Sequence, residues 1–308
     1  MSVRKVSVIG AGFVGASTVQ RISEKELANV VLVDIAEGIP QGKALDMKHS
    51  SPLTGASHIK GTNNFKHIKD SQVIVVTAGI PRKPGMSRED LAKANYKTIS
   101  AICENIIKYA PNAITIVVTN PLDVMAYAAY KKLGMHSSRV FGMGGVLDTA
   151  RYKSLLAEEL QISVSDISAI VLGEHGDKMM PLINYTTVAG IPIKKLLERD
   201  VIDRIVEETK KSGGKIVGYL KTGSAYYAPS AAVTEMVDSI LNDKKRLFTV
   251  STLLQGEYGI KDAFVGVPVV LGVNGVERVI ELELHGKQLS ELKSSTDKLK
   301  KQVKLLDI

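Results

Sequence analysis

The stretch KVSVIGAGFVG, Lys5 to Gly15, decides the fold of this 308-residue chain. A short run of β-branched residues leads into Gly10, Gly12 and Gly15, which form the pattern G-x-G-x-x-G, and an amphipathic helix is expected over 13–24. In this setting the first glycine permits a tight turn, the second lets the backbone approach a pyrophosphate, and the third lets helix and strand pack closely. The helix N-terminus then directs free N–H groups at the phosphates. The pattern therefore predicts a dinucleotide-binding turn rather than an ordinary glycine-rich loop.

A carboxylate at the end of the second expected strand narrows the choice of dinucleotide. The run NVVLVD ends in Asp34, where a carboxylate can accept hydrogen bonds from the ribose hydroxyls of an adenosine. Because the same carboxylate would repel a 2′-phosphate, NAD is favoured over NADP. The six histidines and the single cysteine show no metal-ligand spacing such as C-x-x-C or H-E-x-x-H, so no metal site is expected.

Strand-like and helix-like segments alternate through the first half of the chain. The β-branched runs, each expected to be a strand, are 5–10, 29–34, 72–79 and 113–121. Helical patterns lie near 13–24, 41–49, 88–109 and 122–133. Apolar strands that alternate with helices are typical of a buried parallel sheet with helices on both faces. The predicted fold class is α/β, with a Rossmann-type doubly wound parallel sheet in an NAD-binding domain over residues 1–145.

After about residue 145 the pattern changes to a mixture of long helices and late strands. We expect helices near 147–160, 198–220 and 225–241, a strand at 167–173 and a strand pair within 267–282. In that pair, Asn274-Gly275 suits the positive dihedral angles of a type I′ hairpin turn. Residues 146–308 are therefore predicted to form a second, α+β domain that binds the substrate and carries the catalytic residues.

The bulk composition argues against several classes of protein. The net charge is +8, but many of the lysines lie near the C-terminus between apolar residues at helical spacing, Leu292, Leu299, Val303 and Leu306. Aromatic residues make up 5% of the chain and Trp is absent, so a nucleic-acid partner is not expected. No apolar run is long enough to cross a membrane, and no secretory signal opens the chain. The single cysteine, Cys103, suits a reducing compartment, so a cytoplasmic location is expected.

Two short stretches of the second half carry residues suited to proton transfer. LDTAR places Asp148 and Arg151 three positions apart, on one face of a helix, and GEHGD places His175 in a loop with glycines on both sides. A histidine oriented by a buried carboxylate is a good general base near neutral pH, and an arginine can grip a carboxylate with two parallel bonds. Each piece alone also fits a plainer interpretation, a surface ion pair or a loop histidine without a role.

Six motifs, taken together and in order, make the chain resemble a known family. They are GAGFVG, VDI, TAGIPRKPGMSRED, VVTNPLDV, GMGGVLDTARYKSLLAEEL and VLGEHGDKMMPL, and they span essentially the whole chain. With these motifs the sequence resembles the lactate/malate dehydrogenase family, and most of all its lactate dehydrogenase-like malate dehydrogenase branch. The resemblance implies reversible hydride transfer between (S)-malate and NAD+, giving oxaloacetate and NADH. It also implies a homo-oligomer, a tetramer before a dimer.

The resemblance assigns a role to each residue of the reaction. His175 matches the family's proton acceptor, and Asp148 matches the carboxylate that orients it. Arg151 matches the clamp on the carboxylate beside the reacting carbon. Arg88 matches the loop arginine that polarises the carbonyl group during reduction.

Further residues are implied as ligand contacts. Asn120 and Ser224 match residues of the substrate pocket, and the Asn120–Pro121 bond is a candidate cis peptide because only X-Pro bonds adopt that form readily. The implied cofactor contacts are Gly10, Gly12, Phe13, Val14, Gly15, Asp34, Thr77, Ala78, Gly79, Asn95, Val118 and Asn120.

Position 82 distinguishes the two substrates of the family. A dicarboxylate such as malate needs a cation there, and Arg82 stands where lactate enzymes commonly carry Gln. Since an unpaired guanidinium in a closed site costs roughly 2–5 kcal/mol, a dicarboxylate is favoured. Arg82 and Arg88 share a loop with prolines and glycines that we expect to close over the substrate, whereas Lys83 between them has no assigned role. Two alternatives stay open: an L-lactate or broader 2-hydroxyacid dehydrogenase, and a protein that binds NAD as a sensor without catalysis.

Overall fold

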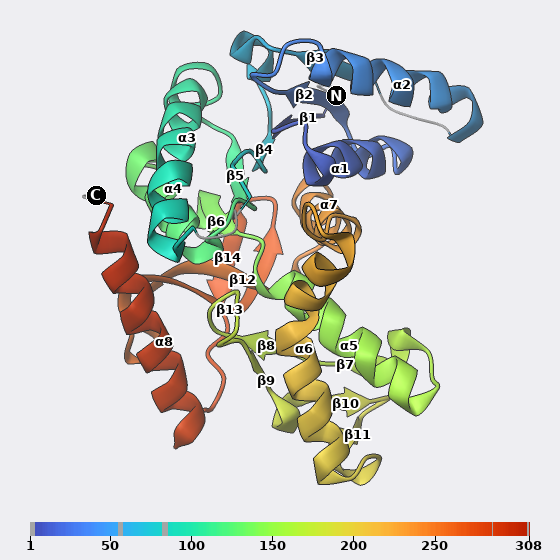
Figure 1. Ribbon diagram of the computed structural model, residues 1–308, viewed down its shortest axis with the longest axis vertical. Helices are drawn as coiled ribbons and strands as arrows, with labels where there is room; N and C mark the ends of the chain where they lie inside the picture. The colour runs from blue at the N-terminus through green and yellow to red at the C-terminus, as the bar shows by residue number, and fades with distance from the viewer. Residues whose placement is uncertain (1–3, 55–57, 82–85, 285, 307) are drawn as a thin grey trace.

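The computed structural model describes residues 4–54, 58–81, 86–284, 286–306 and 308, and for Arg88 it describes the backbone alone. Within these residues, nine strands form one sheet in the order β14-β13-β12-β6-β5-β4-β1-β2-β3 (Figure 1). The strands of the first half are β1 (Lys5–Ile9), β2 (Asn29–Val33), β3 (Ile59–Thr62), β4 (Val73–Val76), β5 (Ile114–Val117) and β6 (Val140–Gly142). They pair in parallel, in the doubly wound order whose ligand crevice lies at the carboxyl ends of β1 and β4. The predicted α/β class is confirmed.

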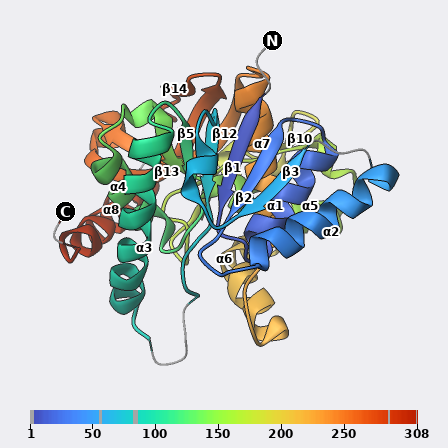
Figure 2. The same ribbon diagram turned by 90° about the horizontal axis from the view of Figure 1, so that it is seen from above.

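Helices cover both faces of this parallel half (Figure 2). On one face lie α1 (Phe13–Glu24) and α2 (Ile39–Thr54), and on the other lie α3 (Arg88–Tyr109) and α4 (Leu122–Leu133). Residues of β1 alternate between the two faces. Val6 and Val8 are buried in one core with Val19 of α1, whereas Ile9 is buried in the other core with Ile99 of α3. The strand is apolar on both sides because both sides are covered.

The boundaries of α1, α3 and α4 are those predicted from the sequence. The N-terminus of α3 is fixed by a capping box in which Ser87 and Asp90 bond each other's backbone N–H groups. α4 ends at Gly134, whose φ of 61° is typical of a glycine that terminates a helix. α2 extends beyond the predicted 41–49. β3 and β6 were not predicted because each is only three or four residues long and neither is a continuous β-branched run.

The second half adds three antiparallel strands to the same sheet: β12 (Arg246–Gln255), β13 (Lys261–Gly272) and β14 (Gly275–Val279). β12 joins the parallel strands where Ser251 pairs with Gly142 of β6. The helices are α5 (Gly145–Leu160), α6 (Arg199–Leu220), α7 (Tyr227–Leu241) and α8 (Lys287–Lys304). Two small sheets consist of β7 (Ile167–Ser168), β10 (Thr187–Val188) and β11 (Ile191–Pro192), and of β8 (Val171–Leu172) and β9 (Met180–Pro181). One sheet thus runs through both halves of the chain.

Two local predictions in the second half were wrong. The strand expected at 167–173 is divided into β7 and β8, which belong to different sheets. The β13–β14 hairpin is present, but Gly272 pairs with Gly275, so Val273 and Asn274 form its loop. Only Gly275 there has a positive φ, of 86°, so the turn is not type I′. A Cβ at Gly275 would stand 2.1 Å from the backbone oxygen of Ser138, which explains the glycine independently of the turn type.

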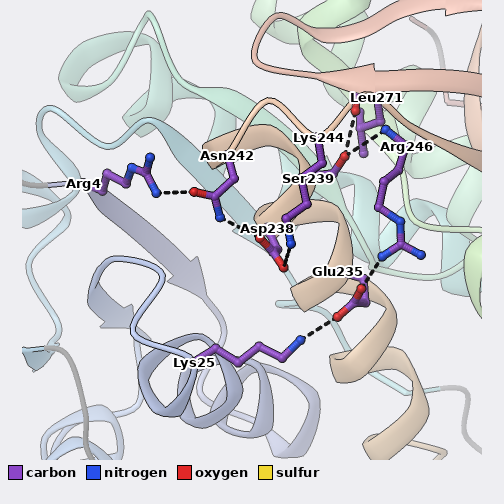
Figure 3. Close-up of polar contacts among 9 residues, drawn as sticks. All are labelled: Arg4, Lys25, Glu235, Asp238, Ser239, Asn242, Lys244, Arg246 and Leu271. Carbon is purple, nitrogen blue, oxygen red and sulfur yellow. Dashed lines mark hydrogen bonds and ion pairs between the residues drawn. The ribbon is translucent and has the colours of Figure 1, made fainter.

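Polar contacts tie α7 to the first half of the chain and to β12 (Figure 3). Lys25, which follows α1, donates from Nζ to Oε1 of Glu235 at 2.6 Å, and Arg246 of β12 binds the other carboxylate oxygen. Arg4 donates to Oδ1 of Asn242 at 2.6 Å. The contacts of Lys25 with Glu235 and of Arg4 with Asn242 join residues that are more than 200 positions apart in the sequence.

Candidate active site

The glycine-rich turn connects β1 to α1 in the way that the sequence predicts. Gly10 has a φ of 107°, and a Cβ at Gly15 would stand 1.8 Å from the backbone oxygen of Gly10. A Cβ at Gly12 would meet nothing within 4 Å. Gly10 and Gly15 are therefore required by the packing of the chain itself. Gly12 instead leaves an open backbone surface at the N-terminus of α1, where a phosphate can approach.

Asp34 lies beside this turn, directly after β2. Its Oδ2 accepts a hydrogen bond from the N–H of Ala11 at 2.5 Å, and its Oδ1 accepts one from the N–H of Ala36 at 2.9 Å. Each carboxylate oxygen keeps a lone pair for a ribose hydroxyl. Lys43 of α2, which was not singled out in the sequence, donates from Nζ to the backbone oxygen of Ala11 at 2.7 Å. The turn is thus flanked by an acid and a base.

The residues that follow β4 pack directly against the glycine-rich turn. Thr77 donates from Oγ1 to the backbone oxygens of Ile9 and Gly10 at 3.1 Å each. A Cβ at Gly10 would stand 2.6 Å from the N atom of Ala78, and a Cβ at Gly79 would stand 2.6 Å from Cγ2 of Thr119. The ends of β1, β4 and β5 therefore meet closely enough to exclude larger side chains at both glycines.

Asn95 of α3 connects this region to the substrate side. Its side chain is 1% exposed; Oδ1 accepts from the N–H of Ile80 at 2.8 Å, and Nδ2 donates to the backbone oxygens of Ile80 at 3.2 Å and Asn120 at 2.7 Å. Asn95 thus holds the start of the loop against Asn120. The peptide bond between Asn120 and Pro121 is cis, as predicted, and Val118 before it is buried.

His175, Asp148 and Arg151 meet in the structure, although the loop that carries the histidine is far from α5 in the sequence. Nδ1 of His175 lies 2.7 Å from Oδ2 of Asp148, and Nη1 of Arg151 lies 3.4 Å from Oδ1 of the same carboxylate. The Asp148 side chain is 2% exposed, and the other two are 13% exposed. Since Asp148 occupies Nδ1, the nitrogen of the imidazole left for a substrate is Nε2.

The charges of this group are adjusted by burial and by one another. Burial disfavours the charged form of His175, but the nearby carboxylates, Asp148 foremost, together outweigh burial, and the pKa of His175 is raised above its ordinary value. Burial lowers the pKa of Arg151, although Asp148 opposes this shift. The Nε atom of Arg151 is buried without a hydrogen-bond partner among the described residues. The pair His175–Asp148 is therefore arranged to accept and hold a proton.

A cavity of about 300 Å³ opens in front of this group. Among the predicted site residues, it is lined by Val14, Val118, Asn120, Arg151, His175 and Ser224. A neighbouring cavity of about 240 Å³ shares Asn120 and His175 with it and extends toward Leu91 of α3 and Leu299 of α8. Residues predicted for the cofactor side and for the substrate side thus line neighbouring cavities with shared walls.

Neither arginine side chain of the predicted loop lies within the described part of the chain. Arg82 lies outside the described residues. Arg88 is the first residue of α3, and its side chain is likewise outside what the structure describes. The structure therefore places the two ends of the loop, at Ile80 and Ser87, but neither guanidinium group.

Three polar residues of the site were not found by sequence reasoning. Lys210 of α6 and Asp177 line the cavity in front of His175. Asp123 of α4 is 3% exposed and accepts the backbone N–H of His175 on Oδ2 at 2.9 Å. The only signal for Asp123 is its place in the run NPLD, four residues that include Asn120.

The described part of the chain offers neither a metal-ligand cluster nor a membrane-spanning helix. No group of three or more His, Cys, Asp or Glu side chains there is placed to hold a metal ion. None of the helices in the described ranges combines the length and the apolar character that a membrane crossing requires.

Comparison with known families gives a match over both halves. The sequence model for the NAD-binding domain of lactate/malate dehydrogenase matches residues 4–142. The model for the α/β C-terminal domain of lactate/malate dehydrogenase matches residues 145–306.

Individual relatives match along the full length. A malate dehydrogenase from Chlorobium chlorochromatii is 51% identical over 305 residues, which cover 98% of each chain. The crystal structure of Cryptosporidium parvum malate dehydrogenase superposes with a TM-score of 0.96 at 42% identity, covering 99% of each chain. The lactate dehydrogenase of the same organism, crystallised with lactic acid and nicotinamide adenine dinucleotide, also gives 0.96, at 39% identity, covering 100% of this chain and 99% of that one. The overall fold therefore does not separate the two substrates.

Proposed function

The chain belongs to the lactate/malate dehydrogenase family, and we propose that it catalyses the reversible oxidation of (S)-malate to oxaloacetate with NAD. The observation that carries this function is the 2.7 Å contact between His175 and the buried Asp148 beside Arg151, at the wall of a cavity that the glycine-rich half of the chain also borders. That arrangement combines a base, a clamp for a carboxylate and a dinucleotide-binding edge, which is what dehydrogenation of a 2-hydroxyacid requires.

Residues at the strand ends hold the cofactor. The open backbone at Gly12 and the N-terminus of α1 bind the pyrophosphate, with Gly10, Phe13, Val14 and Gly15 in the same turn. Asp34 binds the adenosine ribose and disfavours the 2′-phosphate of NADP. Thr77, Ala78, Gly79, Asn95, Val118 and Asn120 complete the side nearer the substrate. NAD supplies the hydride acceptor; the protein supplies binding, orientation and proton transfer.

His175 moves the proton of the reaction. In malate oxidation its neutral Nε2 takes the proton of the substrate hydroxyl, and the resulting imidazolium is stabilised by Asp148 through Nδ1. In oxaloacetate reduction His175 begins protonated and returns that proton to the carbonyl oxygen. Asp148 also holds the ring in the orientation that directs Nε2 into the cavity.

The remaining polar groups fix the substrate. Arg151 grips the carboxylate beside the reacting carbon with a bidentate pair of bonds, for which its unpartnered Nε is available. Asn120 bonds the reacting oxygen, and Ser224 borders the pocket. Arg88 polarises the carbonyl group during reduction, which makes it catalytic as well as substrate-binding.

Arg82 selects malate over lactate by pairing with the second carboxylate, and this assignment is tested by Arg82→Gln. We expect kcat/KM for oxaloacetate to fall by roughly 30-fold to several-thousand-fold, since loss of one partner of a buried charge pair costs roughly 2–5 kcal/mol. Activity on pyruvate should rise. The matched control is Lys83→Gln, which removes a neighbouring charge and should leave both activities within a few-fold. An oxaloacetate kcat/KM that is unchanged in Arg82→Gln would remove Arg82 from the specificity site.

The organisation and setting of the chain follow from the same proposal. Residues 1–145 form the NAD-binding domain and residues 146–308 the catalytic domain, in keeping with the change from parallel to antiparallel pairing at β6. The chain works in the cytoplasm as a homotetramer, with a dimer as second choice. Leu45 and Leu53 of α2, which are 53% and 90% exposed, supply apolar surface for a subunit contact. Sedimentation of the purified chain distinguishes the masses of a monomer, a dimer and a tetramer.

A further inference from the structure

Asp123 lies directly behind the reacting histidine, in the first turn of α4. Its side chain is 3% exposed, and its Oδ2 accepts the backbone N–H of His175 at 2.9 Å. The other oxygen, Oδ1, has no hydrogen-bond partner of good geometry among the described residues, although the Ser251 hydroxyl is near enough to lower the pKa of this carboxyl. Burying an ionised carboxylate costs free energy unless hydrogen bonds or an opposite charge compensate for its lost hydration.

The loop that carries His175 depends on Asp123 for its position. On one side of the histidine, Gly173 pairs with Gly266 of β13 through two backbone bonds of 2.9 and 3.1 Å. On the other side, the N–H of Met179 bonds the backbone oxygen of Gly176. Between these two points, Asp123 accepts the backbone N–H of His175 itself. Gly173 and Gly176 flank the segment that carries His175 and allow its backbone many conformations. The hydrogen bond from His175 to Asp123 therefore limits the positions that the imidazole can take.

Asp123 also lines two cavities. It borders the cavity of about 240 Å³ that contains His175 and a second cavity of about 440 Å³ beneath α8. Leu299 of α8 borders both. Asp123 and Leu299 thus lie where the space around His175 and the space below α8 come close together.

We propose that Asp123 is a positioning residue for the reaction: it holds the backbone of His175 while Asp148 holds the ring, and its negative charge helps His175 to keep the proton taken from the substrate. The inference rests on the proposed function of His175 as the acid and base. It adds a second buried carboxylate to the familiar one, and it gives that carboxylate two separable effects, one on geometry and one on charge.

The electrostatic surroundings of Asp123 act on its charge in opposite directions. Burial raises the pKa of Asp123 above its ordinary value, and the Ser251 hydroxyl and the N–H of His175 offset this shift only in part. The N-terminus of α4 also favours a negative charge in its first turn. The charge of Asp123 in turn favours the protonated form of His175, which raises the pKa of the histidine.

Other charged groups face the pair from the packed elements. Toward His175 these are Asp148 and Arg151 of α5, Lys210 of α6, and Glu174 and Asp177 of its own loop. Toward the far side of Asp123 they are Lys131 of α4, Asp262 of β13, and Lys300 and Lys304 of α8.

Asp123→Asn tests the effect of charge, because the amide oxygen can still accept the N–H of His175. The readout is the pH dependence of kcat/KM for oxaloacetate reduction with NADH, which falls as His175 loses its proton. We expect the descending limb to move to lower pH, with the low-pH plateau within a few-fold of the parent. Asp262→Asn is the matched control, since it removes a carboxylate that borders the other cavity, and its limb should not move.

Asp123→Ala removes the anchor as well, and kcat should then fall on the order of 100-fold, the size expected for a reacting group displaced by about 1 Å. NADH affinity and thermal unfolding are measured for every variant, and Asp123→Ser replaces any variant that does not fold. If a folded variant that lacks the charge of Asp123 keeps the descending limb of kcat/KM at the pH of the parent chain, the proposal is wrong. Absence of oxaloacetate turnover by the parent chain would instead contradict the proposed function.

Discussion

The cofactor side of the site is shaped by close packing of the backbone, whereas the substrate side is held together by buried charged groups. On the cofactor side, Gly10, Gly15 and Asp34 come from one β-α-β unit, and the packing leaves no room for larger side chains at the glycines. On the substrate side, His175 and Asp148 come from separate elements and depend on buried charge. The stability of the cofactor side should therefore be sensitive to added side-chain volume, and catalysis on the substrate side to the loss of a charged group.

The largest effect on turnover is expected when the acid and base of the substrate side is removed. His175→Asn removes the acid and base, and turnover of oxaloacetate should fall by about 10²- to 10⁴-fold. NADH affinity, measured by fluorescence titration, should change little, because the residues that hold NAD lie on the other side. Loss of NADH affinity with the loss of turnover would mean that the two sides are not separable.

A change of volume on the cofactor side is expected to act through folding. Gly15→Ala places a Cβ where 1.8 Å separates it from the Gly10 oxygen, so thermal unfolding should show a loss of about 1–3 kcal/mol or more. Gly12→Ala is the matched control, because a Cβ there meets nothing within 4 Å. That variant should keep its stability and lose NADH affinity. Equal stability of the two variants would contradict the packing described for the turn.

The pH dependence sharpens the electrostatic half of the comparison. Burial lowers the pKa of His175, but Asp148 and Asp123 together raise it above its ordinary value, so oxaloacetate reduction should stay fast below this pKa and decline as pH rises through it. Malate oxidation should show the opposite limb. The stability that the charged pair contributes is present below the unfolded pKa of the histidine and is lost as pH rises through the folded pKa. A reduction limb below the ordinary histidine pKa would contradict the role given to Asp148.

The smallest effect is expected at the contacts that join the two halves at the surface. Lys25 and Glu235 are 49% and 35% exposed, so Lys25→Ala should reduce the free energy of unfolding by less than about 1 kcal/mol. Chemical denaturation with and without added salt measures it. A loss of several kcal/mol would show that this ion pair, rather than the shared sheet, holds α7 in place.

The sequence allowed the first half to be predicted more fully than the second. The limits of α1, α3 and α4 are signalled locally, by the glycine-rich turn, by the Ser87–Asp90 capping box and by Gly134. β6, in contrast, exists because β5 and β12 flank it, and no pattern within its three residues indicates a strand. The division of the expected strand at 167–173 has the same cause, since its two parts pair with different partners.

For the site, spacing indicated the glycine-rich turn and Asp34, while the pairing of His175 with Asp148 rested on family resemblance. A contact between residues of separate elements leaves no trace in local periodicity. Asp123 shows this most clearly, because its bond to His175 joins α4 to a loop of the second half. In the run NPLD, Asp123 looks like an ordinary acidic residue in the first turn of a helix.

The central claim is that this chain acts on a dicarboxylate, and the most direct measurement is kcat/KM for oxaloacetate against pyruvate, with NADH and the unmodified chain. We expect oxaloacetate to be preferred by at least about 30-fold, the lower end of the cost of leaving a buried cation unpaired. Equal values, or a preference for pyruvate, would contradict the account.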